Sequence, residues 1–129
     1  MALKAAMVSV LVDDQERALA FYTEKLGFEK KSDIRNDGYW WVTVTAAGDP
    51  QGVELVLEPL GHPASIPYQQ GLKADGIPLI QLTTDSVSAE VERLKGLGVT
   101  VVSEPQNYGV WSATIDDTCG NLIQIVGGE

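Results

Sequence analysis

Two segments of this chain carry the same pattern about 70 residues apart, and this repeat limits the possible folds more than any other feature. The first segment reads MVSVLVDDQERALAFYTEKLGFEKKSD from Met7, and the second reads LIQLTTDSVSAEVERLKGLGVTVVSEP from Leu79. In each segment, apolar residues alternate along a strand, an aspartate follows, and a helical pattern then ends at a glycine. A repeat of this length is too long for a solenoid unit, so we interpret it as a duplicated half-domain.

Both predicted helices have recognisable boundaries. Asp13 and Glu16 fit a capping box at the start of the first helix. Each helix then carries an apolar stripe that stops at a glycine: Leu19, Tyr22 and Leu26 before Gly27, and Val87, Val91, Leu94 and Leu97 before Gly98.

The strands that follow each helix also align. WVTVT from Trp41 aligns with WSATI from Trp111, and VELVL from Val53 aligns with IQIV from Ile123, which pairs Glu54 with Gln124. The sequence therefore predicts one α+β domain, residues 1–129, made of two tandem βαβββ modules. Module 1 spans residues 5–60 and module 2 spans residues 77–129. The linker, residues 61–76, is rich in Pro and Gly and is expected to hold one helical turn around Tyr68 to Leu72.

The opening VLVDDQERALAFYTEKLGF and the closing DDTCGNLIQIV resemble motifs of the vicinal oxygen chelate superfamily, which includes glyoxalase I, extradiol dioxygenases and bleomycin resistance proteins. This resemblance covers nearly the whole chain. It implies a homodimer, and modules that curve into a cup-shaped mixed sheet with the helices outside. In the family's metal enzymes, the first and last strands of each module supply the ligands. The corresponding positions here are Met7, Glu54, Leu79 and Gln124.

Strand parity supports a ligand cup independently of the resemblance. If Val8, Val10 and Val12 pack under the first helix, Met7 and Ser9 face the opposite side. Adjacent Trp40 and Trp41 must face opposite sides of their strand, so one of them faces the cup or a subunit interface. The candidate ligand-binding residues are Met7, Ser9, Trp40, Trp41, Glu54, Tyr68, Leu79, Gln81, Trp111 and Gln124.

A catalytic divalent ion needs about three protein ligands, which are usually imidazole, carboxylate or thiolate groups. At the family positions only Glu54 qualifies, because Gln124 is a neutral oxygen donor and Met7 and Leu79 are unsuitable. We therefore predict no metal site and no other cofactor. His62 would complete a site only if its loop folded into the cup, and it is otherwise a solvated loop residue. Cys119, in the turn before the last strand, is expected to be structural.

The charge of the chain excludes several partners. A formal net charge of −9 at pH 7 disfavours nucleic acid and anionic membrane surfaces, because both require a basic patch. No apolar run is long enough to span a bilayer, and the N-terminal MALKAAM lacks a secretory apolar region, so we expect a cytoplasmic protein.

These observations favour a metal-free protein that binds a small organic molecule in the cup, as bleomycin resistance proteins do. One alternative is a metal-dependent lyase, isomerase or dioxygenase of the same superfamily, with Glu54 as the catalytic residue. A further alternative is a module for dimerisation or protein docking. The sequence leaves these alternatives open.

Overall fold

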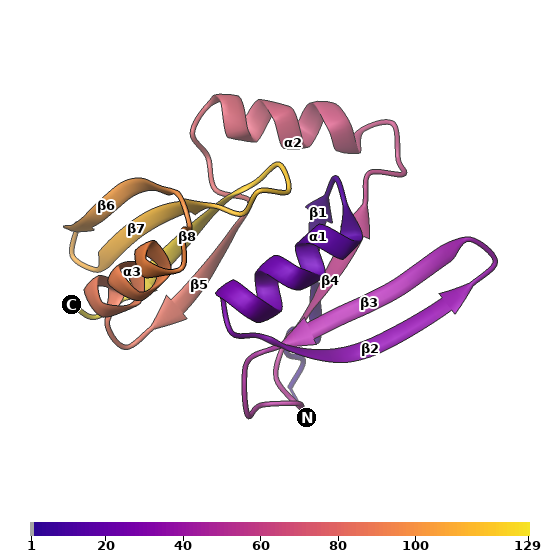
Figure 1. Ribbon diagram of the computed structural model, residues 1–129, viewed down its shortest axis with the longest axis horizontal. Helices are drawn as coiled ribbons and strands as arrows, with labels where there is room; N and C mark the ends of the chain where they lie inside the picture. Colours follow the sequence, from indigo (N-terminus) through magenta and orange to yellow (C-terminus); the bar gives the residue numbers. More distant parts are fainter. Residues whose placement is uncertain (1) are drawn as a thin grey trace. The chain divides into compact units, whose positions relative to one another are not determined.

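The computed structural model describes residues 2–129 and divides into two compact units, with the boundary between Leu60 and Gly61 (Figure 1). Unit 1 contains β1 (Met7–Val12), α1 (Gln15–Ala20), the π-helical turn η1 (Phe21–Lys25), β2 (Glu29–Asn36), β3 (Tyr39–Thr45) and β4 (Glu54–Pro59). Unit 2 contains α2 (Ser65–Ala74), β5 (Ile80–Thr84), α3 (Val87–Gly96), β6 (Val101–Asn107), β7 (Trp111–Asp116) and β8 (Leu122–Gly127).

Each unit has its own four-stranded mixed sheet. The strand orders are β1-β4-β3-β2 in unit 1 and β5-β8-β7-β6 in unit 2. The first strand of each unit pairs in parallel with the last, and the remaining pairs are antiparallel. The predicted fold of two tandem βαβββ modules is therefore confirmed.

The first helix begins one residue later than predicted. Asp14, in an extended conformation, is the N-cap, and its Oδ1 accepts from Arg17 N at 3.0 Å. The predicted capping box at Asp13 and Glu16 is therefore wrong. Two consecutive aspartates offer two possible caps, and the backbone conformation selects the second one.

The buried face of the first helix also differs from the predicted stripe. Ala18, Phe21 and Tyr22 are buried, whereas Leu19 and Leu26 are only half-buried. For Leu26 the reason is the π-helical turn from Phe21 to Lys25, which adds a residue to the helical repeat and shifts the side chains that follow it around the axis.

The third helix follows its prediction more closely. Ser86 is the N-cap, and Val87, Val91 and Leu94 form the buried face. Leu97, predicted to continue that face, is 40% exposed because it lies at the C-cap, beyond the last helical residue.

The end of β8 closes tightly against the segment that leads into α3. Val87 N donates to Gly128 O at 2.9 Å, so this glycine supplements the Ser86 cap. Gly127 has φ +151°, and a Cβ atom placed on it would lie 1.8 Å from Thr84 O. Only glycine fits this position without a rearrangement of the backbone.

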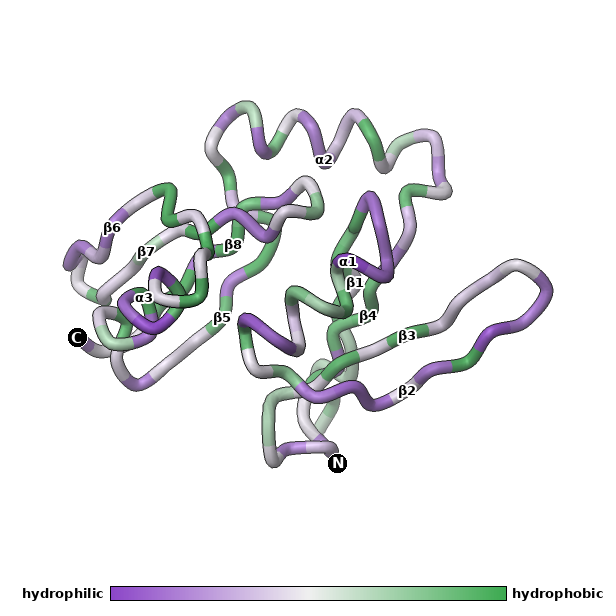
Figure 2. The backbone as a smooth tube through the Cα atoms, in the orientation of Figure 1, coloured by the Kyte–Doolittle hydropathy of each residue, from purple (hydrophilic) through white to green (hydrophobic). Residues whose placement is uncertain are grey.

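The predicted single turn in the linker is a complete helix. Ten residues form α2, and Gln69 is its buried residue. None of the helices among residues 2–129 is long and apolar enough to cross a membrane. Figure 2 shows hydrophobic residues along β4, whereas β2 is largely hydrophilic.

Candidate functional site

In each unit, one face of the sheet carries the apolar core and the other carries a row of polar side chains. We call the second surface the polar face. In unit 1, Met7 lies beside Glu54, and Ser9 and Thr43 lie beside Val56 on either side. Because side chains two residues apart share a face, the polar face of unit 1 comprises Met7, Ser9, Trp41, Thr43 and Glu54.

The two adjacent tryptophans separate as strand parity requires. Trp41 belongs to the polar face, whereas Trp40 lies on the face of Val42 and Val44. There the Arg35 guanidinium stacks 3.9 Å from the ring centroid of Trp40, and Trp40 Nε1 donates to Asp33 Oδ1 at 2.6 Å. Trp40 therefore does not belong to the polar face that contains Glu54.

The Asp33 carboxylate has a lowered pKa because Lys30 and then Trp40 donate hydrogen bonds to it. The Asp33 carboxylate therefore stabilises the folded state at pH values above its ordinary pKa of 3.8. This stabilisation is lost as the pH falls through the lower pKa that Asp33 has in the folded protein. We expect Trp40→Phe to raise the pKa of Asp33 toward 3.8, measured by NMR titration of the carboxyl carbon. Trp41→Phe, on the opposite face, is the control and should leave the titration unchanged. An identical Asp33 titration in wild type and Trp40→Phe would contradict this prediction.

Glu54 is held in a defined orientation at the start of β4. Its Oε1 accepts from Thr43 Oγ1 at 2.7 Å, and Lys31 Nζ lies 3.9 Å from its Oε2. Thr43 Oγ1 in turn accepts from Ser32 N at 3.2 Å. The Glu54 side chain is 14% exposed, so this carboxylate is an oriented and still accessible hydrogen-bond acceptor.

The polar face of unit 2 comprises Gln81, Thr83, Ser112, Thr114 and Gln124. Gln81 and Thr114 flank Gln124, and Thr83 and Ser112 flank Val126. Gln81 Nε2 donates to Gln124 Oε1 at 2.6 Å, and Gln124 Nε2 donates to Ser112 Oγ at 2.8 Å. Three side chains from three strands therefore form one directed hydrogen-bond chain.

Of two further predicted site residues of unit 2, one precedes its strand and the other lies on the opposite face of the sheet. The neighbour of Gln124 on β5 is Gln81, whereas Leu79 precedes the strand and donates its backbone N–H to Leu122 O at 2.8 Å. Trp111 shares the face of Ala113, which pairs with Ile125, and this is the face opposite Gln124. The predicted equivalence of Trp41 and Trp111 is therefore wrong, because an odd shift in register exchanges the two faces of a strand.

Three other residues singled out in the sequence lie on the linker or the last turn. Tyr68, on α2, is 55% exposed. His62 Nδ1 accepts from Ala64 N at 3.0 Å just before α2, so this imidazole stabilises a turn. Cys119 is fully buried between β7 and β8.

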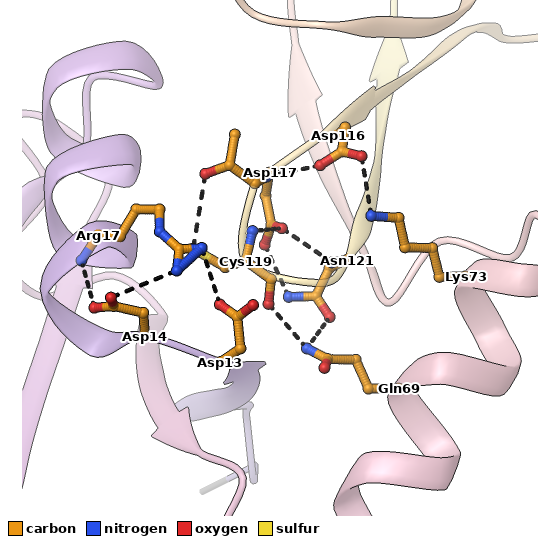
Figure 3. Close-up of polar contacts among 10 residues, drawn as sticks. Asp13, Asp14, Arg17, Gln69, Lys73, Asp116, Asp117, Cys119 and Asn121 are labelled. Carbon is orange, nitrogen blue, oxygen red and sulfur yellow. Dashed lines mark hydrogen bonds and ion pairs between the residues drawn. The ribbon is translucent and has the colours of Figure 1, made fainter.

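The turn around Cys119 contains a polar network that sequence reasoning missed. Asp117 Oδ1 accepts from Cys119 N at 2.8 Å and from Asn121 N at 3.0 Å, and its Oδ2 accepts from Asn121 Nδ2 at 2.8 Å. From α2, Gln69 Nε2 donates to Cys119 O and to Asn121 Oδ1 (Figure 3). Gly120 permits this approach, since a Cβ there would lie 2.7 Å from the Gln69 amide. The closing motif DDTCGN was the available signal for this turn, but it did not identify Gln69.

The sequence profile of the Glyoxalase/Bleomycin resistance protein/Dioxygenase superfamily matches residues 4–125 of the chain. The chain belongs to this superfamily. The resemblance inferred from the opening and closing motifs is thereby confirmed.

Several proteins resemble this superfamily member over almost their full length. It is 46% identical over 125 residues to the "Uncharacterized protein YurT" of Bacillus subtilis (strain 168), covering 96% of this chain and 98% of YurT. Among solved structures, UcmS2 is 32% identical with a TM-score of 0.83, and the match covers 98% of both chains. TnmS3, an antibiotic binding protein from Streptomyces sp. CB03234, is 30% identical with a TM-score of 0.78, covering 100% of this chain and 99% of TnmS3.

The metal positions implied by the superfamily resemblance do not fit a catalytic divalent ion in this chain. Met7 offers a thioether, Leu79 offers no donor atom, and both ends of the Gln124 amide are engaged by Gln81 and Ser112. Glu54 is the one carboxylate of the four. Within residues 2–129, no group of three or more His, Cys, Asp or Glu side chains is arranged to hold a metal ion. This donor set is poorer than the three charged or imidazole ligands of catalytic sites.

Proposed function

We propose that this protein binds small organic molecules on the polar faces of its sheets and holds them by non-covalent contacts, without a metal ion. The observation that supports this proposal is the orientation of the Glu54 and Gln124 side chains. Both are oriented by neighbouring side chains, Thr43 for Glu54 and Gln81 and Ser112 for Gln124, as hydrogen-bonding groups rather than as members of a metal-ligand set.

The surroundings of these groups also suit an organic ligand. Trp41 and Met7 add an aromatic ring and a flexible thioether to the polar face of unit 1, and Met7 is 44% exposed. Apolar surface with a few oriented polar groups is typical of small-molecule sites. The net charge of −9 favours a neutral or cationic molecule over an anion. The similarity to TnmS3, an antibiotic binding protein, supports the same function class.

Thermal unfolding of the EDTA-treated protein tests this proposal. We expect no shift with Mn, Fe(II), Co, Ni or Zn, and a saturable shift with members of a panel of planar neutral or cationic molecules. A ligand present at 100 times its Kd stabilises the folded state by about 2.7 kcal/mol, which raises the unfolding midpoint by several degrees for a chain of this length.

Matched variants locate the binding surface. Trp41→Ala should reduce the ligand-induced shift, whereas Trp40→Ala, on the opposite face of the same strand, should retain it. A saturable shift with a metal that disappears in Glu54→Ala would instead favour the metal-dependent enzyme. A panel without any stabilising molecule would count against the binding function.

A further inference from the structure

We infer that the Ser112 hydroxyl donates a hydrogen bond to the bound molecule, and that this molecule presents a neutral carbonyl oxygen to the polar face of unit 2. This inference rests on the proposed binding function and specifies the chemistry of its ligand. It depends on the direction of each hydrogen bond around Gln124.

Ser112 is a buried hydroxyl with an unused proton. The residue is 8% exposed, and its Oγ accepts from Gln124 Nε2 at 2.8 Å. An amide nitrogen can only donate, so Ser112 is the acceptor in this contact. Over residues 2–129, Gln124 is the only side-chain hydrogen-bond partner of this hydroxyl. Its proton therefore has no acceptor within the described protein and is available to a bound molecule that replaces water at this position.

The Gln124 amide is oriented by its other neighbour. Gln124 Oε1 accepts from Gln81 Nε2 at 2.6 Å, which leaves the nitrogen of Gln124 to face Ser112. The hydrogen-bond chain therefore runs from Gln81 through Gln124 to Ser112. It ends at a hydroxyl whose proton is available to a ligand.

The corresponding hydroxyl in unit 1 has the opposite role. Thr43 lies beside Val56 as Ser112 lies beside Val126. Thr43 Oγ1 accepts from Ser32 N and donates to Glu54 Oε1, so both of its functions are used within the unit. Unit 1 thus presents an acceptor, the Glu54 carboxylate, whereas unit 2 presents a donor. The difference follows from Glu at position 54 and Gln at position 124.

A neutral carbonyl oxygen is the group that best matches this donor. It accepts a hydrogen bond and brings no negative charge to a chain with a net charge of −9. Thr83 and Thr114 add further hydroxyls to the same face of the sheet.

Two probes with the same ring framework isolate the carbonyl contribution. These are 9-fluorenone, which has one carbonyl and no donor, and fluorene, which has no oxygen. Their dissociation constants can be measured by equilibrium dialysis with wild type, Ser112→Ala, Gln124→Glu and the control Ser88→Ala on α3. Comparing the preference for fluorenone over fluorene between variants cancels the difference in hydrophobicity of the two probes.

We expect Ser112→Ala to lower this preference about three- to tenfold, the usual effect of one hydrogen bond. Gln124→Glu should lower it similarly while keeping the hydroxyl, because Ser112 would then donate to the new carboxylate as Thr43 does to Glu54. Ser88→Ala should keep the wild-type preference, because Ser88 lies on α3 and not on the polar face. Far-ultraviolet circular dichroism and thermal melts establish that each variant is folded.

Each remaining outcome counts against a particular statement. If both probes bind and Ser112→Ala or Gln124→Glu retains the wild-type preference, the carbonyl inference is overturned while the binding function stands. If neither probe binds the wild-type protein up to its solubility limit, the carbonyl inference fails, and binding of other panel members would keep the proposed function.

Discussion

Replacing Gly127 with alanine is expected to prevent stable folding or to lower the free energy of unfolding by more than about 3 kcal/mol. The new Cβ would lie 1.8 Å from Thr84 O, and the φ of +151° is itself unfavourable for a residue with a side chain. Both atoms in this clash are fixed, since one belongs to the backbone and the other is attached to it. Relief would require β8 to separate from β5 at the Thr84–Gly127 pair, next to the hydrogen bond from Val87 N to Gly128 O.

Gly96→Ala is the matched control for this substitution. Gly96 is the last residue of α3, and a Cβ placed there would have no neighbouring atom within 4 Å. Alanine should stabilise this position by up to about 1 kcal/mol, because it restricts the unfolded chain and favours the helix. Urea unfolding followed by circular dichroism measures both variants. A Gly127→Ala protein with wild-type stability would show that the strand end relaxes easily.

The second large effect is expected at Asp117. We predict that Asp117→Ala lowers the free energy of unfolding by about 3–5 kcal/mol. Asp117 is fully buried and accepts from Cys119 N, Asn121 N and Asn121 Nδ2. Removing the carboxylate leaves two buried backbone N–H groups without this acceptor and frees the Asn121 side chain. The turn that begins β8 should then open more often.

The buried thiol of Cys119 reports on this opening. Its reaction with a thiol reagent under native conditions should accelerate in Asp117→Ala, together with a lower midpoint in urea. Asp75→Ala, an exposed aspartate at the C-cap of α2, should change the unfolding free energy by less than about 0.5 kcal/mol. Equal stability of the two variants would show that the network at Asp117 contributes little.

The sequence predicted the fold because its strongest signals are local and repeated. Alternating strands, two capped helices and glycines at Gly27 and Gly98 occur in the same order in both halves. The incorrect predictions concern local features of the helices that depend on a single residue. Asp13 and Asp14 are equally good caps by composition, and nothing in the sequence indicates the π-helical turn that shifts Leu26 around the helix axis. Helix α2 was underestimated because Pro67 and Gly71 suggested a loop.

The sequence predicted which candidate residues share a face of each sheet, but it did not predict the hydrogen bonds between them. Parity placed Met7 and Glu54 together correctly in the sheet, and it identified Gln81 and Gln124 as members of one row. The alignment of Trp41 with Trp111 was off by an odd number of residues. For this reason Ser112 was not predicted to lie on the polar face with Gln124. Hydrogen-bond direction was also beyond the sequence, since a glutamine amide can present either its oxygen or its nitrogen to a neighbour.

Because Gln69 bonds to the turn before β8, the two modules should differ in how much sequence change they tolerate at this turn. In module 2, the turn before β8 is held from within by Asp117 and from outside by Gln69, with Gly120 leaving no room for a side chain. In module 1, the corresponding connection, residues 46–53, is mostly exposed and is tied to β2 by the Glu29 and Lys31 side chains. Insertions and sequence drift between β3 and β4 should therefore be tolerated during evolution, whereas the turn before β8 is constrained to its present length.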